Sequence, residues 1–156
     1  FGGDIVKINV KINNCNRTLD VEPGDMLVDV LRKNGYLSVK RACDTGSCGT
    51  CTILIDGEPI ASCSYLAVRA EGHSITTIEG AREEAEKIAE YLNDEGVTQC
   101  GYCSPGLVLN IIAMKNHLKN PTEDEIKHYL AGNLCRCTGY LGQLRAIKKY
   151  LQEVER

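Results

Sequence analysis

The chain has 156 residues, of which 43% are hydrophobic, enough for one ordinary domain or two small ones with buried cores. Its 18 basic and 21 acidic residues give a formal net charge of -3, which argues against a cationic surface for nucleic acid or anionic lipid. No stretch reaches the roughly 18 consecutive apolar residues of a membrane span, and no secretory pattern opens the chain. We therefore expect a cytoplasmic protein whose partners are neither nucleic acid nor membrane.

The first half of the sequence predicts the order of elements of a β-grasp domain. Apolar residues at alternating positions or in short runs predict strands over residues 5–12, 17–21, 52–55 and 75–78. Between the second and third strands, Asp25 suits the N-cap of a helix that stops at Asn34-Gly35. Asp56-Gly57 predicts the turn that follows the third strand. A loop rich in cysteine separates this helix from the third strand.

From Glu79 onward the pattern changes to that of helices. Apolar stripes at helical spacing cover residues 85–92, 107–118 and 141–154. A short helix after Pro121 is predicted by Thr122 as N-cap and Glu125 as its capping-box partner. The fold class is therefore α+β, with a β-grasp domain over residues 1–78 and a four-helix-bundle-like domain over residues 79–156.

Cysteine is the unusual residue, with nine in 156, an odd count without a secretory pattern. Thiols stay free in a reducing compartment, so metal ligation is favoured over disulfides. Cys43, Cys48 and Cys51 have the Cys-x4-Cys-x2-Cys spacing of plant-type 2Fe-2S ferredoxins, with Cys63 as a fourth ligand. Glycine within the loop permits a positive φ that turns backbone N–H groups toward the sulfurs. Structural zinc is the alternative, although zinc prefers cysteines contributed two by two.

The second set of cysteines is ambiguous when taken alone. Its members are Cys100, Cys103, Cys135 and Cys137. Two closely spaced pairs suit one zinc ion or one 2Fe-2S centre. A redox-active dithiol at Cys100 and Cys103 is a third reading, but such a motif usually follows a strand, and here helices surround it. Cys15, the ninth cysteine, lies in an asparagine-rich turn and is given no role.

Three runs of sequence resemble the iron-sulfur subunit of molybdenum hydroxylases, the xanthine dehydrogenase and carbon monoxide dehydrogenase superfamily. They are Cys48-Gly49-Thr50-Cys51, residues 99–106 and residues 132–140. The resemblance implies two 2Fe-2S clusters, one in each domain. It places the first, in a plant-type ferredoxin-like domain, on Cys43, Cys48, Cys51 and Cys63, and the second, in the helical domain, on Cys100, Cys103, Cys135 and Cys137.

The same resemblance implies a function in electron transfer. Electrons would pass one at a time from a molybdenum cofactor, through the helical-domain cluster and then the N-terminal cluster, to FAD. The implied partners are a molybdenum-cofactor-binding large subunit and an FAD-binding medium subunit. Gln99 and the sulfur of Cys137 would approach the molybdopterin, and the substrate, bound in the large subunit, is expected to be a purine or another N-heterocycle.

Two other functions remain open from the residues. One is a free two-cluster ferredoxin-type carrier, for which a dense acidic face would be expected. The other is a zinc-stabilised interaction module. No catalytic residue is predicted, because the sequence shows neither a phosphate-cradling glycine loop nor an assembled Ser/His/Asp set. The three histidines, at residues 73, 117 and 128, are expected at the surface.

Overall fold

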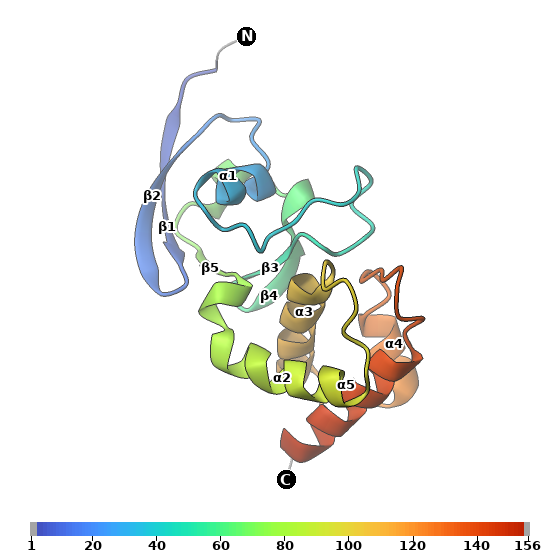
Figure 1. Cartoon of the computed structure of the whole chain (residues 1–156). Helices are drawn as coiled ribbons and strands as arrows, with labels where there is room; N and C mark the ends of the chain where they lie inside the picture. The colour runs from blue at the N-terminus through green and yellow to red at the C-terminus, as the bar shows by residue number, and fades with distance from the viewer. Residues whose placement is uncertain (1–2, 155–156) are drawn as a thin grey trace.

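A mixed sheet with one helix is followed in the chain by a group of four helices (Figure 1). The structure is a computed structural model that describes residues 3–154. The strands are β1 (Val6–Ile12), β2 (Cys15–Val21), β3 (Thr52–Ile55), β4 (Glu58–Ala61) and β5 (Ser74–Thr76). The helices are α1 (Leu27–Lys33), α2 (Arg82–Asp94), α3 (Ser104–His117), α4 (Glu123–Tyr129) and α5 (Leu141–Val154). Short 3-10 helices span Ser62–Ser64, Ala67–Ala70 and Ile78–Gly80.

The sheet has the strand order β2-β1-β5-β3-β4. Strands β1 and β5 are parallel, and the other neighbouring pairs are antiparallel. Alternate residues of β1, namely Ile8, Val10 and Ile12, are buried in a core that they share with α1. The predicted α+β fold, with its β-grasp half and its helical half, is confirmed.

The first half differs from the sequence predictions at three element ends, and strand β4 was not predicted. The hairpin turn uses only Asn13 and Asn14, with φ of 49° and 66°, so β2 begins earlier than predicted, at Cys15. Asp25 is not the N-cap of α1, because Met26 holds that position and the Asp25 carboxylate instead accepts the backbone N–H of Glu22 at 2.9 Å. The last strand ends at Thr76, and Ile78 begins a 3-10 helix.

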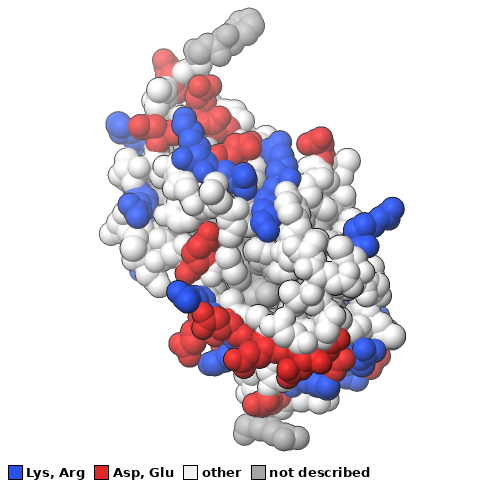
Figure 2. All heavy atoms as spheres, in the orientation of Figure 1, with Lys and Arg blue, Asp and Glu red and all other residues white. Residues whose placement is uncertain are grey.

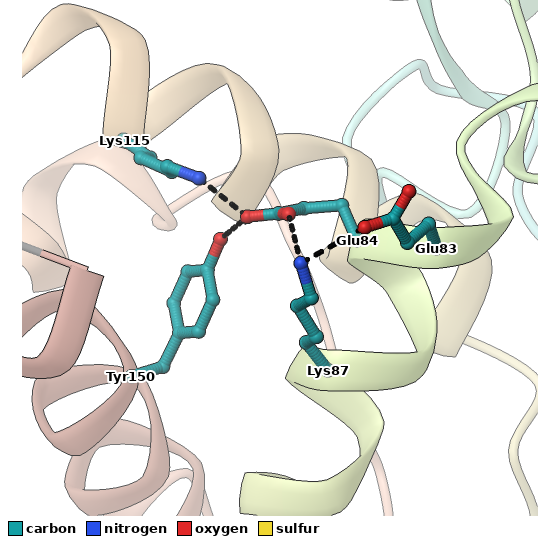
Figure 3. Close-up of polar contacts among 5 residues, drawn as sticks. All are labelled: Glu83, Glu84, Lys87, Lys115 and Tyr150. Carbon is teal, nitrogen blue, oxygen red and sulfur yellow. Dashed lines mark hydrogen bonds and ion pairs between the residues drawn. The ribbon is translucent and has the colours of Figure 1, made fainter.

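Helices α2, α3 and α5 pack around a second apolar core, and α4 contributes Ile126 to it. Glu84 of α2 joins the three helices through polar contacts (Figure 3). Its carboxylate accepts hydrogen bonds from Lys115 Nζ of α3, at 2.5 Å, and from the Tyr150 hydroxyl of α5. Burial raises the pKa of Glu84, but the donors Lys115 and Tyr150 outweigh it, so the net pKa is lowered.

The predicted capping box at the start of α4 is present. The Thr122 hydroxyl accepts the Glu125 backbone N–H at 3.3 Å, and a Glu125 carboxylate oxygen accepts the Thr122 backbone N–H at 2.7 Å.

The two halves are joined by a small apolar cluster on the second face of the sheet. Leu54 of β3 packs there against Leu109 and Ala113 of α3. Strand β3 is therefore buried on both faces, because the first core covers one face and α3 covers the other. The division of the chain between residues 78 and 79 stays a prediction.

Charge is distributed unevenly over the surface. Figure 2 shows acidic side chains gathered in a band over α2, while the face over α3 and the neighbouring loops carries little charge. Most of the band is paired with cations, as in the contacts of Glu83 with Lys87 and of Glu86 with Arg82. Within residues 3–154, none of the helices combines the length and the apolar character needed to cross a membrane.

Candidate metal centres

Four of the five cysteines in the first half of the chain lie outside its strands. Three lie in the irregular loop between α1 and β3, and Cys63 lies in the 3-10 helix after β4. Gly46 and Gly49 in this loop have φ of 70° and 73°, as their positions in the motif predict. We call Cys43, Cys48, Cys51 and Cys63 the first quartet. All nine cysteines of the chain are free thiols.

Within the first quartet the sulfurs lie in two pairs. Cys43 is hydrogen-bonded to Cys48, and this contact, with backbone N–H donors that include Thr45 and Ser47, lowers the pKa of Cys43 to about 6. Cys51 contacts Cys63, and burial raises the pKa of Cys51 to about 11. The loop thus presents one solvated pair rich in N–H donors and one pair set against the core.

The second quartet, Cys100, Cys103, Cys135 and Cys137, lies on two loops at the ends of the helices. The Sγ atoms of Cys100 and Cys137 are 3.6 Å apart. Burial, followed by contact with Cys135, raises the pKa of Cys103 to about 11. The Thr138 hydroxyl donates to Cys135 Sγ at 3.1 Å. The sulfurs again lie in pairs, one exposed and one half-buried.

This pairing suits centres that contain two metal ions. Among residues 3–154, no three His, Cys, Asp or Glu side chains are placed to hold one metal ion. A tetrahedral zinc site needs four donors around one point, whereas in a 2Fe-2S cluster each iron takes two thiolates. Backbone N–H groups directed at the sulfurs would also offset the negative charge of such a cluster. Four thiols and N–H donors in each quartet fit the donor set that a 2Fe-2S cluster needs.

The two cysteine loops touch each other directly. The Leu134 backbone N–H donates to the Cys48 carbonyl oxygen at 2.9 Å. A Cβ atom at Gly49 would lie only 2.3 Å from the Gly132 carbonyl oxygen, and one at Gly106 would lie 2.2 Å from the Gly49 carbonyl oxygen. This contact was not predicted from the sequence, although the glycines within the cysteine motifs were a signal for it.

The structure also places the remaining candidate residues. Gln99 is exposed and directly precedes Cys100, so it shares a surface with the exposed Cys137. Cys15 is exposed in the edge strand β2 and belongs to neither quartet. The histidines lie at or near the surface, as expected: His73 Nδ1 is 2.5 Å from Asp56 Oδ2, and His117 Nδ1 is 2.8 Å from the Tyr129 hydroxyl.

Exposed apolar side chains flank Cys135 and Cys137 in the sequence. Leu134, Tyr140 and Leu141 are 49%, 47% and 64% exposed. A cavity of about 370 Å³ opens beside them, and Leu107, Leu144 and Gln143 are among the residues that line it. Large apolar residues exposed together in this way are typical of a surface that a partner covers.

Comparison with known proteins agrees with this geometry. Residues 10–74 match a family described as a 2Fe-2S iron-sulfur cluster binding domain, and residues 77–148 match one described as a [2Fe-2S] binding domain. The chain is 38% identical over 151 residues to the nicotinate dehydrogenase small FeS subunit of Eubacterium barkeri, covering 95% of this chain and 96% of that one. It is 44% identical over 141 residues to the xanthine dehydrogenase iron-sulfur-binding subunit of Escherichia coli O157:H7, covering 88% and 89%.

Solved structures show the same fold. A chain of quinoline 2-oxidoreductase from Pseudomonas putida 86 superposes with a TM-score of 0.89 at 38% identity, covering 97% of this chain and 96% of that one. The aldehyde oxidoreductase of Desulfovibrio gigas matches with a TM-score of 0.86 at 30% identity, over 96% of this chain but only 17% of that longer chain. With its two 2Fe-2S binding domains, the chain belongs to the family of small iron-sulfur subunits that transfer electrons in molybdenum-dependent hydroxylases and dehydrogenases.

Proposed function

We propose that each quartet binds one 2Fe-2S cluster. The observation that carries this proposal is that the thiols of each quartet lie close enough to shift one another's pKa, with the Sγ atoms of Cys100 and Cys137 3.6 Å apart. When bound, such a cluster accepts and releases one electron at a time. The chain's residues supply the thiolates, the N–H donors that stabilise negative charge, and the packing that holds the two sites together.

Electrons enter at the second quartet and leave from the first. Two features support this direction. The Cys100 and Cys137 pair is exposed with Gln99 beside it, so a molybdopterin in a partner subunit could approach Cys137 and the Gln99 side chain. The exposed apolar residues near the same pair suit a protein partner at that end. The first quartet then passes electrons to FAD.

The partners are a molybdenum-cofactor-binding large subunit and an FAD-binding medium subunit. This is supported by relatives that are named as subunits of larger dehydrogenases. The substrate, bound in the large subunit, is a purine or another N-heterocycle, since relatives are named for xanthine, nicotinate and quinoline, although others are named for aldehydes. The free thiols fit a reducing, cytoplasmic location.

Iron analysis with low-temperature EPR tests the cluster assignment. Anaerobically purified protein should contain about four iron atoms per chain and show two distinct signals at full reduction. Cys48→Ala should remove one signal and Cys103→Ala the other, whereas Cys15→Ala, the matched control outside both quartets, should keep both. Protein without iron, or with a single signal, would refute the assignment.

Co-purification tests the subunit assignment. Native protein should elute with larger chains that contain molybdenum and flavin. If it elutes alone with both clusters in place, it is a free carrier and the partner assignment is wrong.

A further inference from the structure

Lys40 and Tyr102 form a contact between the two halves of the chain beside both quartets. The Lys40 ammonium group lies 4.7 Å from the centre of the Tyr102 ring and 3.4 Å from the Tyr102 carbonyl oxygen. The Tyr102 hydroxyl donates to the carbonyl oxygen of Arg41 at 3.0 Å. The side chain of Tyr102 is 44% exposed, so apolar burial does not account for its position.

Each end of this contact leads to a sulfur atom of a different quartet. The Tyr102 backbone N–H is directed at the thiol of Cys100, two residues earlier in the chain. On the other side, the Lys40 backbone N–H donates to the Thr50 carbonyl oxygen at 3.4 Å. The Thr50 hydroxyl lies 3.2 Å from Cys48 Sγ. Thr50 and Lys40 therefore connect Cys48 of the first quartet to Tyr102, which lies between Cys100 and Cys103 of the second in the sequence.

A second tyrosine shows that Tyr102 is not simply an ordinary surface ring. Tyr65 also has a cation near its ring, Arg69 at 5.4 Å, and its hydroxyl donates to the Arg69 carbonyl oxygen at 3.2 Å. Both of these contacts are made with a residue four positions away, inside the first half of the chain. Tyr102 instead uses its N–H, carbonyl, ring and hydroxyl together, and three of these groups contact residues 40 and 41 of the other half.

We propose that Tyr102 is a positioning residue that holds the two iron centres at a fixed separation, and that Lys40 favours their reduced states. This inference rests on the proposed function. With both clusters bound, one electron would pass from the reduced centre of the second quartet to the oxidised centre of the first, with no proton or bond exchanged. Because electronic coupling falls steeply with distance, a loosened contact slows that step. A cation near a centre stabilises the negative charge gained on reduction and raises the potential.

The experiment uses the full chain with both clusters loaded. Tyr102→Phe removes only the hydroxyl, and Lys40→Gln removes the charge while keeping a hydrogen-bond donor. The readouts are iron content, the two reduction potentials, the magnetic splitting between the two centres at full reduction, and the rate of electron exchange between them. Tyr129→Phe is the matched control, because it removes a tyrosine hydroxyl whose hydrogen-bond partner, His117, lies outside both cysteine loops.

Tyr102→Phe should keep its iron and both signals, but weaken the splitting between the centres and slow electron exchange between them relative to the wild type. Lys40→Gln should lower the potential of at least one centre, and Lys40→Arg should restore it. The inference would be overturned if the magnetic splitting and the electron-exchange rate were the same in Tyr102→Phe and Tyr129→Phe. It would also be overturned if Lys40→Gln left both reduction potentials unchanged.

These outcomes separate the inference from the proposed function. Wild-type protein lacking iron or one of its signals contradicts the proposed function itself. If the wild-type protein holds both clusters but the Tyr102 and Lys40 variants have unchanged splitting, exchange rate and potentials, only the roles proposed for Tyr102 and Lys40 are contradicted. If Tyr102→Phe loses iron, Lys40→Gln still tests the contact from its other end.

Discussion

The backbone N–H of Leu134 donates to the carbonyl oxygen of Cys48 at 2.9 Å, and this bond joins loops from opposite halves of the chain. Leu134 precedes Cys135, a member of the second quartet, and Cys48 belongs to the first. One hydrogen bond, from the Leu134 N–H to the Cys48 carbonyl oxygen, and the backbone of Leu134 therefore connect Cys48 to Cys135. The glycines around this bond allow the loops to come so close.

Gly49→Ala should separate the two loops. A Cβ at residue 49 would lie 2.3 Å from the Gly132 carbonyl oxygen, and its φ of 73° is also unfavourable for alanine. Gly57→Ala is the matched control, since its φ is 89° but no atom lies within 4 Å of the added Cβ. The control should lose only the stability that a positive φ costs an alanine, about 1–2 kcal/mol. Thermal unfolding should show a clearly larger loss for Gly49→Ala, with altered coupling between the clusters, and equal losses would contradict the prediction.

Gly106→Ala should destabilise the chain although it lies in a helix. Replacing a helical glycine with alanine normally stabilises by about 0.5–1 kcal/mol. Here the added Cβ would lie 2.2 Å from the Gly49 carbonyl oxygen, so the sign should reverse. Asn116→Ala, on the exposed side of the same helix, should instead stabilise by about 0.5 kcal/mol. Urea unfolding measures the stability of both variants. If Gly106→Ala is more stable than the wild type, the loop that contains Gly49 moves away without loss of stability, and the prediction is wrong.

Glu84→Gln should reduce both stability and its dependence on pH. The pKa of Glu84 is lowered in the folded chain, since the donors Lys115 and Tyr150 outweigh the opposing effect of burial. A lowered pKa means that the stability is present above the ordinary glutamate pKa of about 4.3 and is lost as pH falls through the folded-state pKa. At pH 7 the free energy of unfolding of the variant should be about 1–2 kcal/mol below that of the wild type. Between pH 7 and acid, the free energy of unfolding should fall less in the variant than in the wild type.

Glu83→Gln is the control for this experiment. Its side chain is 89% exposed and pairs only with Lys87 among the described residues, so the loss should stay below about 0.5 kcal/mol. Urea unfolding at several pH values measures the free energy of unfolding of both variants. If that free energy changes with pH in the same way in both variants, Glu84 is not the cause of the pH dependence.

Thr122→Ala should loosen α4 at its start. The substitution removes the side-chain acceptor of the Glu125 N–H and should cost about 1 kcal/mol. Asp124→Ala, whose side chain is 94% exposed and bonded to Lys127, should cost less than half of that. Hydrogen exchange at the amides of α4 provides the measurement, and equal protection in the two variants would show that the capping box does not hold the helix.

Features that depend on neighbours in the chain were predicted well from the sequence. The capping box of Thr122 and Glu125 and the turn at Asp56-Gly57 follow from backbone conformations that these residues favour. Asp25 shows the limit of such reasoning, because its carboxylate accepts the backbone N–H of Glu22 instead of capping α1.

The sequence by itself determined the periodicity of the elements, the spacing of the cysteines and the resemblance that groups them into two quartets. Only the tertiary structure decided that the loops of these quartets meet, through Leu134 and Cys48 and through Lys40 and Tyr102. The physical reason is range. Turn, cap and strand preferences act over a few residues, whereas the contact between the loops depends on how α3 packs against β3, which is the sum of many weak apolar contacts between distant segments.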